Sequence, residues 1–196
     1  MRISGGKARG VALSVSKSSV HRPATDRLRQ GIFSSLGKQI ENIDICDLFA
    51  GTGSYGLEAL SRGAASATFV ENSRRACEMI RRNIAIVSKS MGVDRLNATV
   101  LAKDATKPHS FSSEPFDLIF ADPPYELLDS IAMDLFRAAD RNLRADGLFI
   151  LEAPGNYEYE AQGWTLSKRI GKGTDQPTAL FYERERVDAY DESSNT

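Results

Sequence analysis

The sequence predicts an α/β protein with a doubly wound, mostly parallel sheet, and three observations lead to this fold class. Short apolar runs typical of buried strands alternate with amphipathic segments typical of helices. A glycine-rich turn, Gly51-Thr52-Gly53-Ser54-Tyr55-Gly56, joins the first main run to a helix-forming segment. Acidic residues follow several of the runs, at the carboxyl ends of the expected strands, where such sheets bind ligands.

Composition is typical of a single globular domain. The chain has 196 residues, of which 26% are charged and 41% hydrophobic, and this length can bury a substantial core. No apolar run approaches the roughly 20 residues that span a bilayer, and the N-terminus has no apolar signal core. We therefore expect a cytoplasmic protein that is not attached to a membrane. We also expect a monomer, although neither composition nor any motif determines the oligomeric state.

Metal chemistry is not expected. Cys46 falls in a predicted strand and Cys77 on an apolar helix face, so buried free thiols are expected. His21 and His109 stand alone, without the spacing of metal ligands around them.

Charge is distributed unevenly. Residues 1–40 carry eight lysines and arginines against one aspartate, a charge of +7, so the remainder must carry −8 to give the net −1. A basic segment on an acidic body is typical of a surface that binds a polyanion such as RNA. A solvated arm without a partner is the alternative. The candidate contacts are Arg2, Lys7, Arg9, Arg22 and Arg27.

The basic segment is expected to contain a hairpin and a helix. Residues 2–16 predict a hairpin with a turn at Ser4-Gly5-Gly6, and residues 17–24 a polar loop. Thr25 can cap a helix that runs to about Leu36, with Gly37 at its end. Arg27 and Arg29 lie off its apolar face, where they could pair with nearby acids, or meet phosphates or a ligand carboxylate.

The rest of the chain predicts alternating strands and helices. Strands are expected at about 43–49, 67–71, 97–101, 116–121 and 147–152, and helices at about 57–62, 73–88 and 127–142. Residues 164–167 and 178–182 predict a closing antiparallel pair. We divide the chain into a basic arm and helix (1–40), a main domain (41–184) and an acidic tail, expected to be disordered (185–196).

The glycine turn predicts a cofactor site. Gly51 and Gly53 can adopt backbone angles that other residues avoid and leave room for a ligand. With Gly56, and with Glu71 placed 20 residues after Gly51 to accept ribose hydroxyls, the spacing also fits a dinucleotide fingerprint. S-adenosylmethionine (SAM) enzymes use the same architecture, so a second motif must decide. Glu71 could instead cap the next helix, and the turn could bind nothing.

Further along, Asp104 follows the third expected strand, where a short acid often meets an adenine amino group. This is a prediction from position alone.

The deciding motif is Asp122-Pro123-Pro124-Tyr125, which follows the fourth expected strand. Asp122 and the Pro123 carbonyl can accept two N–H bonds from a planar exocyclic amine, and Tyr125 can stack on its ring. Such hydrogen bonds can turn the delocalised lone pair of the nitrogen toward a methyl sulfonium. Together with the glycine turn, the motif predicts SAM-dependent methylation of an amino nitrogen, although by itself it could be a strand-ending turn.

Several functions stay open at this point. The acceptor could be RNA, DNA adenine or cytosine, or a protein glutamine amide. A nicotinamide oxidoreductase could use the glycines and Glu71, and a non-catalytic RNA-binding assembly factor could use the basic arm alone. The Asp-Pro-Pro-Tyr motif argues against the last two.

The sequence resembles the bacterial RsmD-like family of 16S ribosomal RNA guanine-N2 methyltransferases. The resemblance covers residues 2 to about 152, and more loosely to about 184. It rests on five segments: Arg2-Ile3-Ser4-Gly5-Gly6, Arg9-Gly10, the segment from Arg22-Pro23 to Leu28-Arg29, Asp47 to Gly53, and Gly56 to Ala64. Gln30 stands where an acid is usual in the family, and Tyr125 where phenylalanine is frequent.

The resemblance implies a Rossmann-like class I SAM-dependent methyltransferase fold with a seven-stranded sheet. SAM would be the cofactor, without a metal. The small ribosomal subunit or its assembly intermediate would be the partner, and N2 of the guanine at position 966 of 16S rRNA the target. Asp122, Pro123 and Tyr125 would lie at the target base. The implied cofactor residues are Asp47, Ala50, Gly51, Thr52, Gly53, Glu71, Asn72, Asp104 and Ala105.

Overall fold

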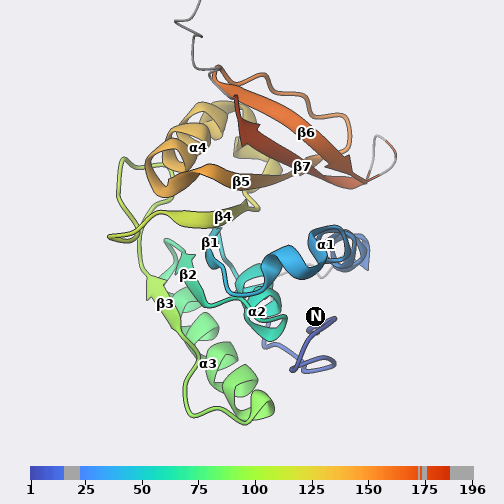
Figure 1. Ribbon diagram of the computed structural model, residues 1–196, viewed down its shortest axis with the longest axis vertical. Helices are drawn as coiled ribbons and strands as arrows, with labels where there is room; N and C mark the ends of the chain where they lie inside the picture. Colours follow the sequence, from blue (N-terminus) through green and yellow to red (C-terminus); the bar gives the residue numbers. More distant parts are fainter. Residues whose placement is uncertain (16–22, 172, 174–175, 186–196) are drawn as a thin grey trace, which may run out of the picture.

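One seven-stranded sheet forms the centre of the protein (Figure 1). The computed structural model describes residues 1–15, 23–171, 173 and 176–185. The strands lie in the order β3-β2-β1-β4-β5-β7-β6. The first five are parallel to one another, and β7 runs antiparallel to both β5 and β6. Their bounds are β1 Asp44–Leu48, β2 Ser66–Val70, β3 Ala98–Leu101, β4 Phe116–Ala121, β5 Leu143–Pro154, β6 Trp164–Ile170 and β7 Pro177–Arg184.

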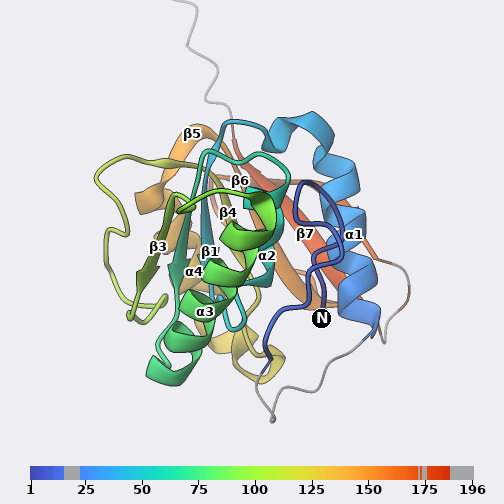
Figure 2. The ribbon, with the colours of Figure 1, turned by 90° about the horizontal axis from the view of Figure 1, so that it is seen from below.

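Helices cover both faces of the sheet (Figures 1 and 2). The helices α1 (Pro23–Leu36), α2 (Ser54–Ser61) and α3 (Arg74–Met91) lie on one face, and α4 (Leu128–Asn142) lies on the other. Two short 3₁₀ helices, η1 (Gly37–Ile40) and η2 (Tyr125–Leu127), follow α1 and precede α4. The predicted class, a seven-stranded mostly parallel sheet, is confirmed.

Alternation along the strands divides the core into two layers. On β4, Leu118 and Phe120 face the side of α1, α2 and α3, whereas Ile119 and Ala121 face α4. All four side chains are buried, as expected for a central strand that is covered on both faces. Cys46 and Cys77 are both buried free thiols, as predicted.

The structure corrects the start of the first helix. Thr25 is not its N-cap, because α1 already begins at Pro23. Proline suits the first position of a helix, since the N–H that it lacks would have no helical partner there. Residues 16–22 and 186–196, which include most of the predicted polar loop and acidic tail, lie outside the described residues.

The predicted hairpin in the arm is less regular than expected. Arg2 and Ala12 form a single antiparallel bridge, with flanking backbone hydrogen bonds from Ile3 N to Val11 O (2.9 Å) and from Leu13 N to Met1 O (3.2 Å). The connection between the two sides spans residues 4–10 and docks on α2, where Lys7 N donates to Ser61 O at 2.8 Å. Contacts with this helix, and not a two-residue turn, therefore shape the arm.

The third glycine of the turn has a packing role that can be tested. A Cβ atom at Gly56 would lie 2.3 Å from Cε1 of the buried Phe69 ring on β2, so α2 approaches the sheet too closely for a side chain. We expect Gly56→Ala to lower the free energy of unfolding by about 1–3 kcal/mol through overpacking, measured by urea denaturation. Ser90→Ala, at an exposed position of α3, should change it by less than about 0.5 kcal/mol. Equal stability of Gly56→Ala and the wild type would contradict this packing role.

Candidate active site

The loop between β1 and α2 has a backbone that needs its glycines. Gly51 and Gly53 have φ angles of 54° and 77°, and Gly53 is the residue before the first turn of α2. Phe49, which is not a glycine, also has a positive φ of 58°, an uncommon conformation that concentrates at functional sites. A Cβ atom at Gly51 would meet only the Phe49 carbonyl oxygen, at 3.8 Å. The space beside the loop is therefore open to a ligand.

A carboxylate from β2 holds this loop. Glu71 follows the last residue of β2, and its two oxygens accept hydrogen bonds from Gly51 N (3.0 Å) and Ser73 N (2.8 Å). Glu71 is half-buried, and its neighbour Asn72 is exposed. The geometry is thus compatible with both predicted roles of Glu71, binding a ribose and capping the next helix. Its carboxylate accepts from Ser73 N, just before α3, and from Gly51 N in the glycine loop.

Asp47 lies behind the loop. It is 1% exposed, and its carboxylate accepts a hydrogen bond from Gly56 N at 3.0 Å. Burial raises its pKa from 3.8 to about 7; the hydrogen bond from Gly56 opposes this shift, and the nearby Glu71 carboxylate adds to it. Asp47 therefore fixes the end of β1 to the start of α2. Its contact with a cofactor stays a prediction, as does that of the buried Ala50.

At the end of β3, Asp104 is half-buried and forms a local turn. Its Oδ1 accepts hydrogen bonds from Thr106 N (2.9 Å) and Thr106 Oγ1 (2.7 Å), and these bonds hold the pKa of the carboxyl below its usual value. Ala105 is buried in the core layer below α4. Both bonds go to Oδ1 and neither uses Oδ2. The contact of Asp104 with an adenine stays a prediction.

The Asp-Pro-Pro-Tyr motif follows β4, next to the glycine loop. β1 pairs with β4 so that Leu48 lies opposite Ala121, and Asp122 N donates to Leu48 O at 3.4 Å. Asp122 is exposed, Pro123 is buried and Tyr125 is half-buried. The structure thus brings the two predicted motifs together at one edge of the sheet.

Glu152, at the end of β5, belongs to the same site, although no motif singled it out. It is 3% exposed and accepts hydrogen bonds from Tyr55 Oη (2.5 Å) and Tyr125 Oη (3.2 Å). Its position at the carboxyl end of the strand next to β4 is the signal that could have found it. Tyr55 comes from the glycine turn itself and is also buried.

The electrostatics of this edge are unusual. Asp122 is exposed, whereas Glu152 and Asp47, whose charges act on it, are buried. Loss of solvation around its carboxyl group raises the pKa of Asp122 well above its usual value, and the negative charges of Glu152 and Asp47 raise it further. Burial also raises the pKa of Glu152, against the hydrogen bonds of the two tyrosines and the Arg29 guanidinium, which lower it. Clustered carboxyl groups with raised pKa values are typical of functional sites.

A cavity of about 720 Å³ adjoins the cofactor loop. Gly51 and Thr52 form part of its wall, together with Ser14 of the arm and the first turns of α3, including Arg75. Such a volume can hold a small-molecule cofactor.

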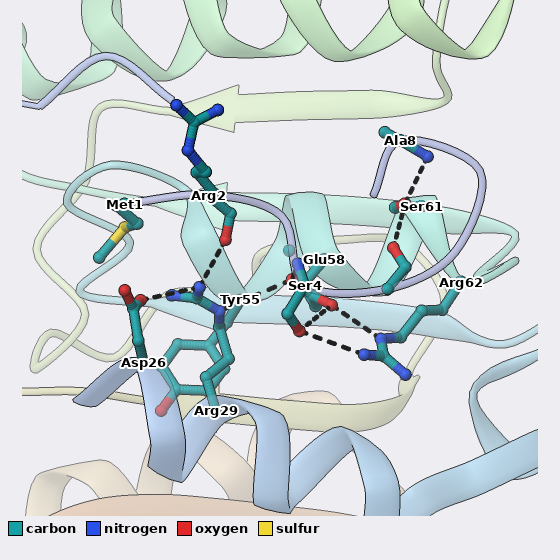
Figure 3. A network of polar contacts seen from close by, with 12 residues as sticks. Met1, Arg2, Ser4, Ala8, Asp26, Arg29, Tyr55, Glu58, Ser61 and Arg62 are labelled. Carbon is teal, nitrogen blue, oxygen red and sulfur yellow. Dashed lines mark hydrogen bonds and ion pairs between the residues drawn. The ribbon is translucent and has the colours of Figure 1, made fainter. Parts of the chain in front are cut away.

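A buried polar network attaches the basic arm to the domain (Figure 3). Glu58 on α2 is fully buried and accepts hydrogen bonds from Ser4 N and Ser4 Oγ, each at 2.7 Å. Its carboxylate also pairs with Arg62 (2.8 Å) and with Arg29 (3.7 Å). Arg29 in turn pairs with Asp26 and donates to the Arg2 carbonyl at 2.8 Å. The arm is therefore a docked part of the molecule.

The structure separates the predicted RNA contacts by their surroundings. Lys7, Arg9 and Arg27 are exposed. Arg2 is also exposed, but its guanidinium donates a hydrogen bond to Gly10 O at 2.8 Å. Arg22 lies outside the described residues. Arg29, for which pairing with an acid was one of two expectations, is 2% exposed and paired. Gln30, at the position where the resemblance expects an acid, is exposed.

The described residues contain neither a cluster of metal-ligating side chains nor a membrane-spanning helix. Within residues 1–15, 23–171, 173 and 176–185, no three His, Cys, Asp or Glu side chains gather in a way that could bind a metal ion. No helix in the same ranges combines the length and apolar character needed to cross a bilayer.

The fold is that of class I methyltransferases. The chain aligns with a solved structure from Escherichia coli, "Putative methyltransferase yhhF", with a TM-score of 0.76 and 29% identity, covering 94% of this chain and 98% of that one. The chain belongs to the family described as Conserved hypothetical protein 95, the RsmD-like family, whose model matches residues 1–183. The resemblance identified from the sequence is confirmed.

Relatives named ribosomal RNA small subunit methyltransferase D include proteins from Escherichia coli and Haemophilus influenzae. The protein from Escherichia coli K12 is 38% identical over 125 residues, which are 64% of this chain and 60% of that protein. The protein from Haemophilus influenzae is 33% identical over 179 residues, which are 88% of this chain and 89% of that protein. The match thus spans less than two thirds of the first relative and most of the second.

The raised pKa of Asp47 predicts a dependence of stability on pH. Because the folded pKa, about 7, lies above the unfolded value of 3.8, folding takes up a proton between these values, and stability is lost as pH rises through this range. Asp47→Asn keeps an acceptor for Gly56 N and removes this loss. We expect its stability relative to wild type to increase from pH 4 to pH 7 and then level off, measured by urea denaturation. The exposed control Asp94→Asn should give a flat difference, and a flat difference for Asp47→Asn would contradict the assignment.

The arm network predicts a second effect. Glu58→Gln leaves Arg29 and Arg62 without a buried carboxylate, so we expect a loss of roughly 3 kcal/mol in unfolding free energy. Trypsin should also cut faster after Lys7 and Arg9, as followed by mass spectrometry. Glu78→Gln breaks an exposed pair with Arg82 (3.6 Å) and should cost less than about 1 kcal/mol. An arm equally resistant in both variants would refute the anchoring role of Glu58.

Proposed function

We propose that this protein transfers a methyl group from SAM to the exocyclic N2 of a guanine in 16S ribosomal RNA. The observation that carries the proposal is the placement of Asp122-Pro123-Pro124-Tyr125 beside the open glycine loop, on neighbouring strands β4 and β1. The family, and the names of the Escherichia coli and Haemophilus influenzae relatives, support an acceptor in the small ribosomal subunit. An assembled particle or its assembly intermediate is the proposed partner.

The residues at the glycine loop fit SAM. The loop offers a backbone without side chains at Gly51 and Gly53, and the Glu71 carboxylate lies within hydrogen-bond distance of this loop. We propose that Gly51, Thr52 and Gly53 lie along the methionine part of SAM, Glu71 at its ribose and Asp104 near its adenine. When bound, SAM would supply an electrophilic methyl group on a sulfonium, and it would leave as the neutral thioether S-adenosylhomocysteine once the methyl group has moved to nitrogen.

Asp122 and Pro123 orient the acceptor nitrogen. The guanine amine is a poor nucleophile because its lone pair is delocalised into the ring. Hydrogen bonds from its two hydrogens to the Asp122 carboxylate and the Pro123 carbonyl direct the lone pair toward the methyl carbon, and alignment supplies much of the rate. The Asp122 charge also stabilises the positive charge that develops on nitrogen. That nitrogen is acidic after methylation and loses a proton to Asp122 or water.

The exposed cations provide the proposed RNA contacts. Lys7 and Arg9 on the docked arm, and Arg27 on α1, are free to approach phosphates, and Arg2 and Arg22 complete the proposed set. The target base leaves its stack to reach the site, where Tyr125 stacks on it. By resemblance, the target is the guanine at position 966. We further propose that the protein acts as a monomer in the cytoplasm.

Methyl transfer from labelled SAM tests the proposal. Small-subunit particles that lack their native methylation should accept one methyl group, identified as N2-methylguanosine by nucleoside analysis. Asp122→Ala should reduce transfer by roughly 100-fold or more while SAM still binds. The exposed control Asp129→Ala on α4 should transfer at the wild-type rate.

The same assay distinguishes the alternatives. Label in DNA or in a protein amide would redirect the proposal to another conjugated amine. Thermal protection by NAD without protection by SAM would favour an oxidoreductase. Salt-sensitive RNA binding without transfer would favour an assembly factor, and wild-type activity of Asp122→Ala would refute the role of Asp122.

A further inference from the structure

Glu152 is placed beside Asp122 by the register of the sheet. Ala121 on β4 pairs with Leu151 on β5, so Asp122 and Glu152 are the next residues on two adjacent parallel strands. Both lie at the carboxyl edge of the sheet. Asp122 is exposed to solvent, whereas Glu152 is buried, with 3% of its surface exposed. Glu152 therefore lies directly behind the residues proposed to bind the target base.

Both oxygens of Glu152 are occupied by tyrosine hydroxyls. Tyr55 donates to Oε2 at 2.5 Å and Tyr125 donates to Oε1 at 3.2 Å. The Tyr55 ring is itself fixed, because it stacks on Phe120 with 5.0 Å between ring centroids. Glu152 thus connects a rigid ring in the core to the half-buried ring at the crevice. Because Tyr55 holds Oε2 of the carboxylate, the bond from Tyr125 to Oε1 can restrain the Tyr125 ring.

We propose that Glu152 is a positioning residue: it holds the Tyr125 ring in the orientation that stacks on the target base, and it places a second negative charge beside Asp122. This inference rests on the proposed function. Because phenylalanine is frequent at the position of Tyr125 in the RsmD-like family, the restraint through the hydroxyl is a feature of this chain.

The charge of Glu152 is one of several that act on the pKa of Asp122. Asp47 faces Asp122 from β1, Glu152 from β5 and Tyr55 from α2, while Arg29 from α1 acts on Glu152 and Tyr55 with opposite sign. Asp122 accepts the amine hydrogens as a carboxylate, so transfer falls on the acid side as it is protonated. Removal of the Glu152 charge lowers the pKa of Asp122. The acid limb of the rate profile should then move to lower pH.

Three variants separate these effects in the methyl-transfer assay. Glu152→Gln keeps the size of the side chain and removes its charge, and should shift the acid limb of kcat/KM down by about one pH unit. Tyr125→Phe keeps the ring and removes the bond to Glu152. It should raise KM for the particle about 5-fold, the equivalent of one hydrogen bond, with little change in the limb. Glu126→Gln, an exposed neighbour, should match wild type in both measurements.

A purely structural Glu152 would give a different result. Glu152→Gln would then lower the melting temperature and the amount of active enzyme, with the position of the acid limb unchanged, and this outcome would overturn the inference. Wild-type KM in Tyr125→Phe would overturn the restraint on the ring.

A second measurement does not depend on activity. The Asp122 carboxyl can be titrated by NMR in protein labelled with ¹³C at aspartate, with the signal assigned from Asp122→Asn. Its midpoint should fall by about one pH unit in Glu152→Gln, and an unchanged midpoint would overturn the inference. If wild type transfers no methyl group while the midpoint shifts, the proposed function fails, but the pairing of Glu152 with Asp122 stands.

Discussion

The parallel pairing of β1 with β4 is the constraint on which the rest of the structure depends. It places the end of β1, with its glycine loop, next to the end of β4, with its Asp-Pro-Pro-Tyr motif. The two segments are far apart in the sequence, and neither would form a site without the other. The order of the sheet then adds Glu71 from β2 on one side and Glu152 from β5 on the other. Four strand ends therefore place these residues along one edge of the sheet.

The same edge collects carboxyl groups that oppose folding. Asp47 and Glu152 are buried, and burial raises the pKa of both carboxyl groups. Loss of solvation also raises the pKa of Asp122, and the negative charges of Asp47 and Glu152 raise it further. Such a cluster is unfavourable for stability when all members are charged. Its retention at the carboxyl edge of the sheet is understandable if the negative charge is needed there. Hydrogen bonds from Gly56, Tyr55 and Tyr125 offset part of the cost.

The basic arm is connected to this edge through Arg29. Its guanidinium reaches the Arg2 carbonyl, the Glu58 carboxylate and the Asp26 carboxylate (Figure 3). Burial raises the pKa of Tyr55 and of Glu152, and the positive charge of Arg29 acts to lower both. Described cations of the segment therefore serve different purposes. Arg29 is used inside the protein to attach the arm, and Lys7, Arg9 and Arg27 are left at the surface, where a polyanion can reach them.

The sequence by itself determined the fold class, most strand and helix positions and the two motifs of the site. These follow from local patterns: apolar period, glycines that need positive φ at Gly51 and Gly53, and a rigid Asp-Pro-Pro-Tyr segment. β4, for example, has the expected bounds, Phe116–Ala121. The family could also be identified from these residues.

Only the tertiary structure decided which charged side chains are used inside the protein. Asp47 and Glu71 are both acids at the carboxyl ends of neighbouring strands. Only the structure shows that Asp47 is buried behind the glycine loop and that Glu71 lies at the edge of this loop. Arg29 and Glu58 each have one partner within four residues, Asp26 and Arg62, but Glu58 also binds Ser4 and Arg29, and Glu152 binds Tyr55. These last partners come from segments that are distant along the chain. Burial and pairing of a charge depend on packing between elements, and a pattern of neighbouring residues does not contain that information.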